Sequence, residues 1–395
     1  MNDEGGEGAR PGPSPVALST ICREWTRIGC IGFGGPPTHI ALLRRTCVEQ
    51  RHWLEPQEFE DGVATTNLLP GPSSTQLAIF CAWRLRGPVG AVVGGLSFIV
   101  PGLILILALS AVFLSSHPPT WIVGAAAGAG AAVPAIAVKA ASGFVPPSWT
   151  RIGARRSQKV RWILYALVGV ASAAAAGSYL VLALLACGLV EMIVRRQRQR
   201  PPQSLRSLAP FAVSHAVAVG GFGALALVAF KVGALSYGGG FVIVPLMQHD
   251  AVTTYHFMTG QQFLSAVVLG QVTPGPVVQT VAVVGYAVGG IGGGLFAALV
   301  AFLPSFVFVL VGGRHFDRVR ANTSIQSFLT GAGAAVIGAI AGSAIPLGLS
   351  FGHLWQIAGL GAALFWLFVI RRGVVSALLL TGIVGVVLAV SGVSV

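Results

Sequence analysis

Long apolar stretches, separated by short polar and basic segments, run along almost the whole chain. A helix that crosses the hydrocarbon core of a bilayer needs roughly 20 mostly apolar residues. Stretches of this kind predict about five spanning helices in each half, at 17–35, 88–114, 120–145, 160–176 and 178–194, and at 211–235, 288–312, 326–345, 350–370 and 373–392. The pattern therefore predicts an all-α polytopic membrane protein.

Two further apolar segments, at 61–82 and 262–286, each contain the sequence Pro-Gly-Pro. The copies lie 204 residues apart, and at the same offset Gly34 aligns with Gly238 and His52 with His256. The chain is therefore predicted to be a duplication. We expect a disordered tail at 1–15, an N-terminal repeat at 16–200 and a C-terminal repeat at 201–395.

Pro-Gly-Pro breaks a helix, because proline lacks a backbone N–H and its ring clashes with the carbonyl four residues earlier. The freed backbone groups are tolerated in a membrane only where they are buried in protein or line a watery cavity. Helices interrupted at corresponding places of two repeats indicate a transporter's binding site. With Pro72 and Pro276 as first helical residues, two open helix N-termini would present N–H groups to an anion. A kinked helix with ordinary packing is the alternative.

The distribution of Lys and Arg predicts the topology, because basic loops stay on the cytoplasmic side. If the two Pro-Gly-Pro segments re-enter the membrane instead of crossing it, nearly all basic loop residues fall on one side. Each repeat then crosses an odd number of times, so the repeats have inverted topology, which is the architecture of alternating access. The loop from Gly238 to Gly260 agrees, since it has no Lys or Arg. Chance loss of charge after duplication is the alternative, and crossing and re-entry both stay open.

The polar and glycine residues at the two breaks are the candidate substrate-binding residues: Asn67, Pro70, Gly71, Pro72, Ser73, Ser74, Thr75, Gln76, Gln271, Thr273, Pro274, Gly275, Pro276 and Gln279. A glycine-rich motif after the first helix of each repeat predicts a hinge or cavity wall, at Phe33, Gly34, Gly35, Pro36 and His39 and at Tyr237, Gly238 and Gly239. A plain helix cap is the alternative for a Gly-Gly pair.

Ionisable residues within or beside spans are candidates for charge or proton coupling. They are Arg23, Arg27, Glu58 and Asp61. Alternatively, the two arginines extend their charged groups to the membrane interface, and the two carboxylates belong to solvated loop residues.

Composition supports a membrane protein and excludes other classes. Apolar residues make up 54% and charged residues 9% of the chain, against roughly 25% charged in soluble domains. The net charge of +13 comes from short clusters between spans, so no nucleic-acid partner is expected. The five cysteines have no metal-ligand spacing, and we expect neither a metal site nor a cofactor.

Several motifs resemble the chromate ion transporter family: Phe33-Gly34-Gly35-Pro36, His39-Ile40, Trp53, Glu58-Phe59, Asn67-x-x-Pro70-Gly71-Pro72 and Pro101, with Tyr237–Gly239 and Pro274–Pro276 as in two-domain members. The resemblance implies a prokaryotic inner-membrane carrier of two inverted domains that exports chromate and so confers chromate resistance. It implies that export is driven by membrane potential, protons or exchange against sulfate. The sequence departs from the family at Cys81-Ala82-Trp83 and at Gly240.

We therefore expect a secondary active transporter of a tetrahedral oxyanion, chromate or sulfate, with protons as one candidate coupling ion and antiport with sulfate as another. It is expected to be a multi-pass protein of the inner membrane bilayer. The oligomeric state stays open, and a homodimer is one possibility. An anion channel is an alternative, although channels typically have symmetry about the membrane normal. A membrane-embedded enzyme is a further alternative, but no Ser/His/Asp set or paired intramembrane carboxylates recur, so we expect no enzyme.

Overall fold

The computed structural model describes residues 16–67, 71–115, 118–153, 155–175, 180–199, 221–236, 243–312 and 322–394. This part of the chain is helical and contains no strand, which confirms the prediction of an all-α protein. The expected tail at 1–15, Pro70 and the motif at Tyr237–Gly239 lie outside the described residues.

The first half folds into α1 (Leu18–Ile31), α2 (Pro36–Arg44), a π-helical turn η1 (Arg45–Gln50), α3 (Pro56–Thr66), α4 (Ser73–Phe113), α5 (Thr120–Arg151), α6 (Arg156–Ala175) and α7 (Leu180–Gln199). The second half folds into α8 (Phe222–Leu235), α9 (Ile243–Gln248), the π-helical turn η3 (His249–Thr254), α10 (Gly260–Val272), the 3-10 turn η4 (Val277–Gln279), α11 (Thr280–Gly312), α13 (Thr323–Gly342), α14 (Ala344–Leu349), α15 (Trp355–Leu364), the π-helical turn η5 (Phe365–Val369) and α16 (Val374–Val390).

Among the described residues, four helical segments are long and apolar enough to cross a membrane: Ser73–Phe113, Thr120–Arg151, Val277–Gly312 and Thr323–Leu349. Three shorter apolar segments are Phe222–Leu235, Trp355–Val369 and Val374–Val390. The expected spans at 88–114 and 288–312 are not separate helices. Each continues from the helix that follows a Pro-Gly-Pro, across a kink with non-helical backbone at Arg86 and Gly87 in α4 and at Gly289 and Gly290 in α11.

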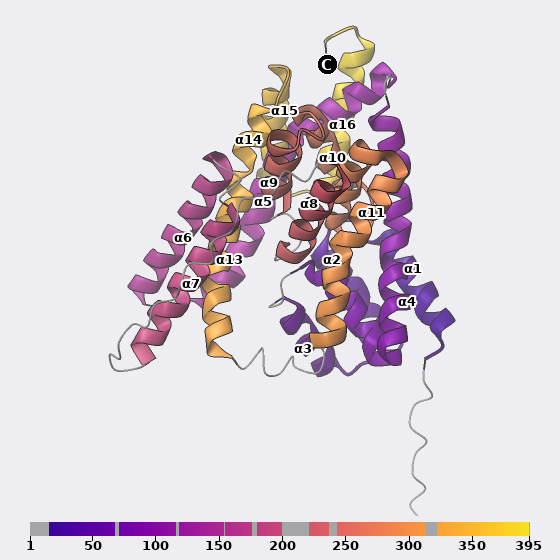
Figure 1. The fold of residues 1–395 in the computed structure, drawn as a ribbon. Coiled ribbons are helices and arrows are strands. Elements are labelled where there is room, and N and C mark those ends of the chain that lie inside the picture. Colours follow the sequence, from indigo (N-terminus) through magenta and orange to yellow (C-terminus); the bar gives the residue numbers. More distant parts are fainter. Residues whose placement is uncertain are drawn as a thin grey trace, which may run out of the picture.

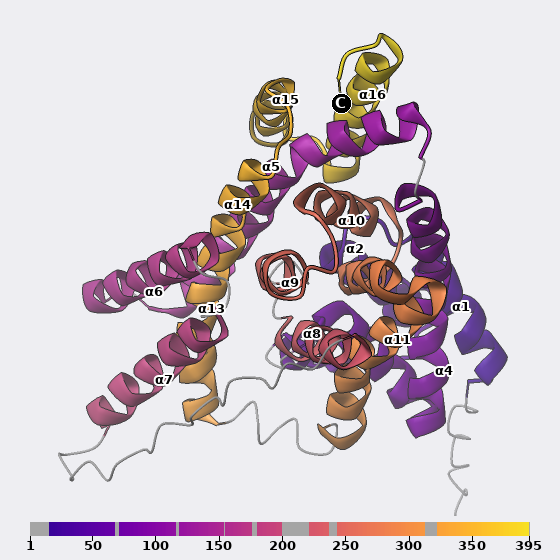
Figure 2. The ribbon, with the colours of Figure 1, turned by 45° about the horizontal axis from the view of Figure 1, so that its top comes forward.

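The helices pack in two groups (Figures 1 and 2). In one group α1 packs on α4, α4 on α11, and α11 on α8. In the other group α5 and α13 pack on each other, α13 carries α6 and α7, and α5 carries α15 and α16. The last helix pair of each half therefore packs on a helix of the other half.

Close backbone approach at small residues holds the second group together. A Cβ at Gly338 of α13 would lie 1.8 Å from the carbonyl oxygen of Ala166 in α6, and one at Gly385 of α16 would lie 2.0 Å from that of Gly124 in α5. Only glycine fits at such distances, and packing at small residues is a common way for helices to associate in lipid.

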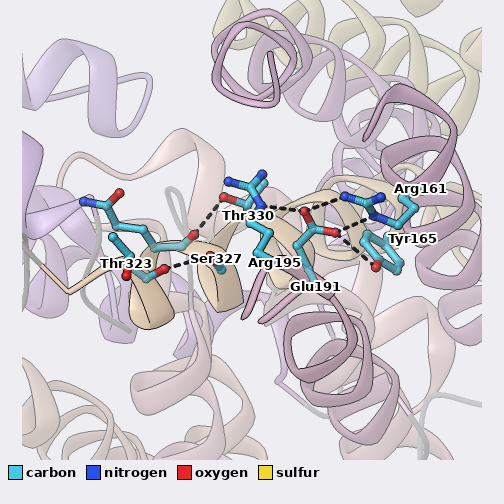
Figure 3. Close-up of polar contacts among 8 residues, drawn as sticks. Arg161, Tyr165, Glu191, Arg195, Thr323, Ser327 and Thr330 are labelled. Carbon is cyan, nitrogen blue, oxygen red and sulfur yellow. Dashed lines mark hydrogen bonds and ion pairs between the residues drawn. The ribbon is translucent and has the colours of Figure 1, made fainter. Parts of the chain in front are cut away.

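A buried ionic cluster joins α6 to α7 (Figure 3). The Glu191 carboxylate accepts hydrogen bonds from Arg161 at 2.8 Å, from Arg195 at 2.7 Å and from the Tyr165 hydroxyl at 3.2 Å. The Glu191 side chain is only 4% exposed. Because buried charges need partners, the cluster fixes the register of this helix pair and occupies both arginines.

Candidate functional site

The first break lies between α3 and α4. Helix α3 ends at Thr66 with Asn67 as its C-cap, and Gly71 has φ 114°, a left-handed backbone that favours glycine. Pro72 is the N-cap of α4 and not its first helical residue, and Pro276 has the same place before η4. This corrects the expected position by one residue. The open N–H groups therefore begin at Ser73 and at Val277.

The chain folds back on itself at the first break. Gly62 of α3 lies against Phe80 of α4, since a Cβ at Gly62 would be 2.5 Å from the Phe80 ring. Glu58 of α3 and Arg84 of α4 form an ion pair at the open end of this hairpin. Glu58 therefore lies at the open end of the hairpin, where it pairs with Arg84, and not at the turn between α3 and α4.

The glycine turn after α1 has the backbone that its sequence predicts. Gly34 and Gly35 have φ of 97° and 77°, and Pro36 is the first residue of α2. Phe33 is 42% exposed. A Cβ at Gly35 would be 3.8 Å from the Val277 side chain, so this turn lies beside the second break.

A chain of hydrogen bonds joins the two breaks through this turn. The carbonyl oxygen of Gly32 accepts from the backbone N–H of Gly275, at 3.0 Å, and from Nε2 of His39, at 2.9 Å. Nδ1 of His39 lies 3.2 Å from Oγ of Ser74 in the first turn of α4. The sequence placed these four residues in three separate motifs.

The protonation of His39 follows from its surroundings. Burial lowers the pKa of His39 to about 4, against a smaller opposing effect of its hydrogen bond to Gly32. The ring is therefore neutral at pH 7 with its proton on Nε2, because a carbonyl can only accept. Nδ1 is then the acceptor and the Ser74 hydroxyl the donor. Ser74 can offer a ligand its backbone N–H, but its hydroxyl proton is already used.

The second break packs against the kinked helix of the first half. Nε2 of Gln279 donates to the carbonyl oxygen of Ile99 in α4 at 2.7 Å. A Cβ at Gly102 would lie 2.2 Å from the carbonyl oxygen of Pro274. The first break in turn approaches α8, since a Cβ at Gly71 would be 3.4 Å from the carbonyl oxygen of Gly233. Each break therefore contacts the other half of the chain.

Several threonine hydroxyls near the breaks donate to carbonyls of their own helical turns: Thr66 to Gly62 at 2.9 Å, Thr273 to Leu269 at 2.8 Å and Thr280 to Val277 at 2.7 Å. These hydroxyl protons are not available to a ligand, which the residue types alone did not reveal.

Other polar atoms at the breaks are buried without a hydrogen-bond partner among the described residues. They are Oγ1 of Thr75, Nε2 of Gln271 and Oε1 of Gln279, on side chains whose residues are 0%, 7% and 1% exposed. Buried polar atoms are nearly always paired, so these three are candidates to bind a partner that the described residues do not supply. The Thr75 hydroxyl and the Gln271 amide can donate to an anion, whereas the Gln279 oxygen can only accept.

The first break also borders a cavity of about 250 Å³, several times the roughly 30 Å³ that one water occupies. Asn67, Ser73 and Pro36 line it on one side, and residues of α5 and α13 on the other. A second cavity, of about 310 Å³, lies near the opposite end of α5 and is lined by Thr259, Gln261 and others.

Of the charged candidates, Arg23 and Arg27 are exposed, with side chains 71% and 64% accessible. Both pair with Glu24, which is 7% exposed and accepts from Arg51 at 2.6 Å. The buried ionisable group on α1 is therefore Glu24, which the sequence placed only beside the two arginines.

The second half has a comparable ion pair with a buried acid. Lys231 of α8 lies 3.0 Å from Asp250 of η3, whose side chain is 7% exposed. The sequence did not indicate this pair, because its members are 19 positions apart and α9 lies between them. Asp61, the remaining charged candidate, lies on α3. Its carboxylate accepts a hydrogen bond from the Gln57 amide at 3.4 Å.

Comparison with known proteins gives the same family for both halves. The family model described as chromate transporter matches residues 19–192 and 223–389. A chromate transport protein of Cupriavidus metallidurans is 33% identical over 341 residues, 84% of this chain and 82% of the relative. One of Pseudomonas aeruginosa is 30% identical over 352 residues, 85% of this chain and 82% of the relative.

A probable chromate transport protein of Synechococcus elongatus is 28% identical over 344 residues, 84% of this chain and 85% of the relative. No solved structure matches the chain. With its long apolar helices, its paired breaks and a family match in each half, this multi-pass membrane protein belongs to the chromate transporter family.

Proposed function

We propose that the chain is a secondary active transporter that carries a tetrahedral oxyanion, chromate or sulfate, across the inner membrane. The observation that carries the proposal is the hydrogen-bonded path from Ser74 through His39 and Gly32 to Gly275. It joins two broken helices from opposite halves of the chain, which is where such transporters bind their substrates.

The chemistry of the site favours an anion. Open N–H groups at Ser73 and Val277, the Thr75 hydroxyl and the Gln271 amide are all donors, and helix N-termini add partial positive charge. Chromate and sulfate have the same charge and shape, so the donors bind both. The relatives named chromate transport proteins favour chromate, and efflux would then confer resistance.

We further propose that the halves are inverted repeats whose broken segments re-enter the membrane. Matching backbone supports a common fold: His52 and His256 both have φ 50°, and Gly71 and Gly275 have φ 114° and 102°. The exchanged packing of the last helix pairs supports a twofold relation. A proton or sulfate as coupling ion is part of the same proposal.

Flux in proteoliposomes tests the transport function. Purified protein is expected to accumulate radiolabelled sulfate when a pH or voltage gradient is imposed, with chromate as a competitor. Uptake equal to that of empty liposomes would contradict the proposal. Fast downhill flux that ignores the gradient would indicate a channel.

A pair of variants tests the site itself. Thr75→Val removes an unpartnered hydroxyl, and we expect it to weaken sulfate affinity at least tenfold, because a hydrogen bond to a charged group contributes roughly 1.5–3 kcal/mol. Thr273→Val removes a hydroxyl whose proton is already donated to the Leu269 carbonyl, and it is the control. Equal affinities in both variants would remove Thr75 from the site.

A further inference from the structure

The cavity beside the first break is lined by polar groups from two parts of the fold. Asn67 and Ser73 belong to the break, and Ser148 and Arg151 belong to the last two turns of α5. Most of the remaining lining, including Phe144 and residues of α13, is apolar. The residue that adds a cation to this lining is exposed, so its charge can attract an anion from solution.

Arg151 is that cation. Its Nε donates to the carbonyl oxygen of Pro147 at 3.2 Å, which orients the guanidinium. No carboxylate of the described residues lies within ion-pair distance of Arg151. Arg161 and Arg195 near the same end are different, because both are paired with Glu191 (Figure 3). Arg151 therefore keeps its positive charge uncompensated at the cavity.

Ser148 supplies a free hydroxyl proton on the same wall. Its Oγ accepts the indole N–H of Trp162 at 2.8 Å, so its own O–H remains available to donate. Thr330 also lines the cavity, but its hydroxyl donates to Gln326 of its own helix at 2.7 Å. The donor set at this wall is thus Arg151 and Ser148, one turn or less apart.

We propose that this cavity is the loading site at which an oxyanion first binds, held by Arg151 and Ser148 before it reaches Asn67 and Ser73 at the break. The inference rests on the proposed transport function. Planar guanidinium suits tetrahedral oxyanions because it donates two parallel hydrogen bonds. The α5 end that bears Arg151 belongs to the basic side, which the positive-inside rule assigns to the cytoplasm, and export begins there.

Kinetics of sulfate transport from the basic side test the inference. Arg151→Gln is expected to raise the KM at least tenfold with little change in kcat, and Arg151→Lys to restore part of the affinity. Arg155→Gln, at the same end but outside the cavity lining, is the control. A KM unchanged in Arg151→Gln overturns the inference, whereas absence of sulfate or chromate transport in the wild type overturns the proposed function instead.

Binding can also be followed without transport. In a cysteine-free variant, Ser148→Cys is labelled with a small maleimide in detergent. Sulfate or chromate is expected to slow the labelling, and to lose this effect when Arg151→Gln is added, while chloride at equal ionic strength has no effect. Labelling that neither oxyanion slows would overturn the loading site even if transport is normal.

Discussion

At the scale of single residues, one carbonyl group joins the two halves of the candidate site. The oxygen of Gly32 accepts both from Gly275 and from His39, so a neutral histidine and a broken helix share one acceptor. Both lone pairs of that carbonyl are then used. The shared carbonyl therefore links the second break to His39, and His39 links it to Ser74.

The contact of the second break with α4 can be tested at one residue. Gly102→Ala places a methyl group 2.2 Å from the carbonyl oxygen of Pro274, so the break must shift. We expect loss of most sulfate flux in proteoliposomes with normal membrane insertion. Gly292→Ala is the control, since nothing lies within 4 Å of a Cβ there and alanine favours the helix. Equal flux in the two variants would contradict the importance of this contact.

At the scale of elements, a kink follows each break a short distance along the chain. Each break is followed by a short helix that ends at a kink, where Gly87 and Gly290 have φ of 61° and 58°. The short helix after the first break packs back on α3 and is held there by Glu58 and Arg84. The break therefore depends on tertiary contacts on both sides, and not on proline alone.

Replacement of Pro70-Gly71-Pro72 by three alanines tests the first break. Alanine restores the backbone donors and favours a continuous helix, which would pull α3 away from α4. We expect insertion without sulfate transport, measured as detergent-stable protein and as flux. Pro146→Ala, in the exposed part of α5, is the control and should transport normally. Normal flux in the triple variant would show that the break is not required.

At the scale of the whole molecule, each half of the chain provides packing surfaces for helices of the other half. The last two helices of one half pack on α5 or α13 of the opposite half, and each break touches the opposite half. Neither half is therefore expected to form the site alone. Under the proposed function, two parts of the molecule would move against each other around a site at their boundary.

Inverted topology predicts opposite accessibility of aligned residues. Glu49 and Thr253 occupy aligned, exposed positions in η1 and η3. In a cysteine-free background, Glu49→Cys and Thr253→Cys should react with an impermeant maleimide from opposite sides of oriented membrane vesicles. Labelling of both from the same side would contradict the inverted repeats.

Much of the fold was predictable because its signals are local. Apolar length predicts helices, and identical motifs at one offset predict matched breaks, whatever the rest of the chain does.

The site was only partly predictable. Residue types suggested that every hydroxyl near the breaks could bind an anion, but Ser74 and Thr273 donate within the protein. Which atoms remain free is a property of the packing.

The sequence by itself determined that this chain is helical, lies in a membrane and is interrupted twice by Pro-Gly-Pro. These properties follow from side-chain polarity and from proline's missing donor, which act within a few residues. Only the tertiary structure decided that Gly275 meets Gly32, that Glu24, Glu191 and Asp250 are buried acids, and that Arg151 and Asn67 line the same cavity. Such pairings join residues far apart in the chain, and they depend on how the helices of the two halves pack.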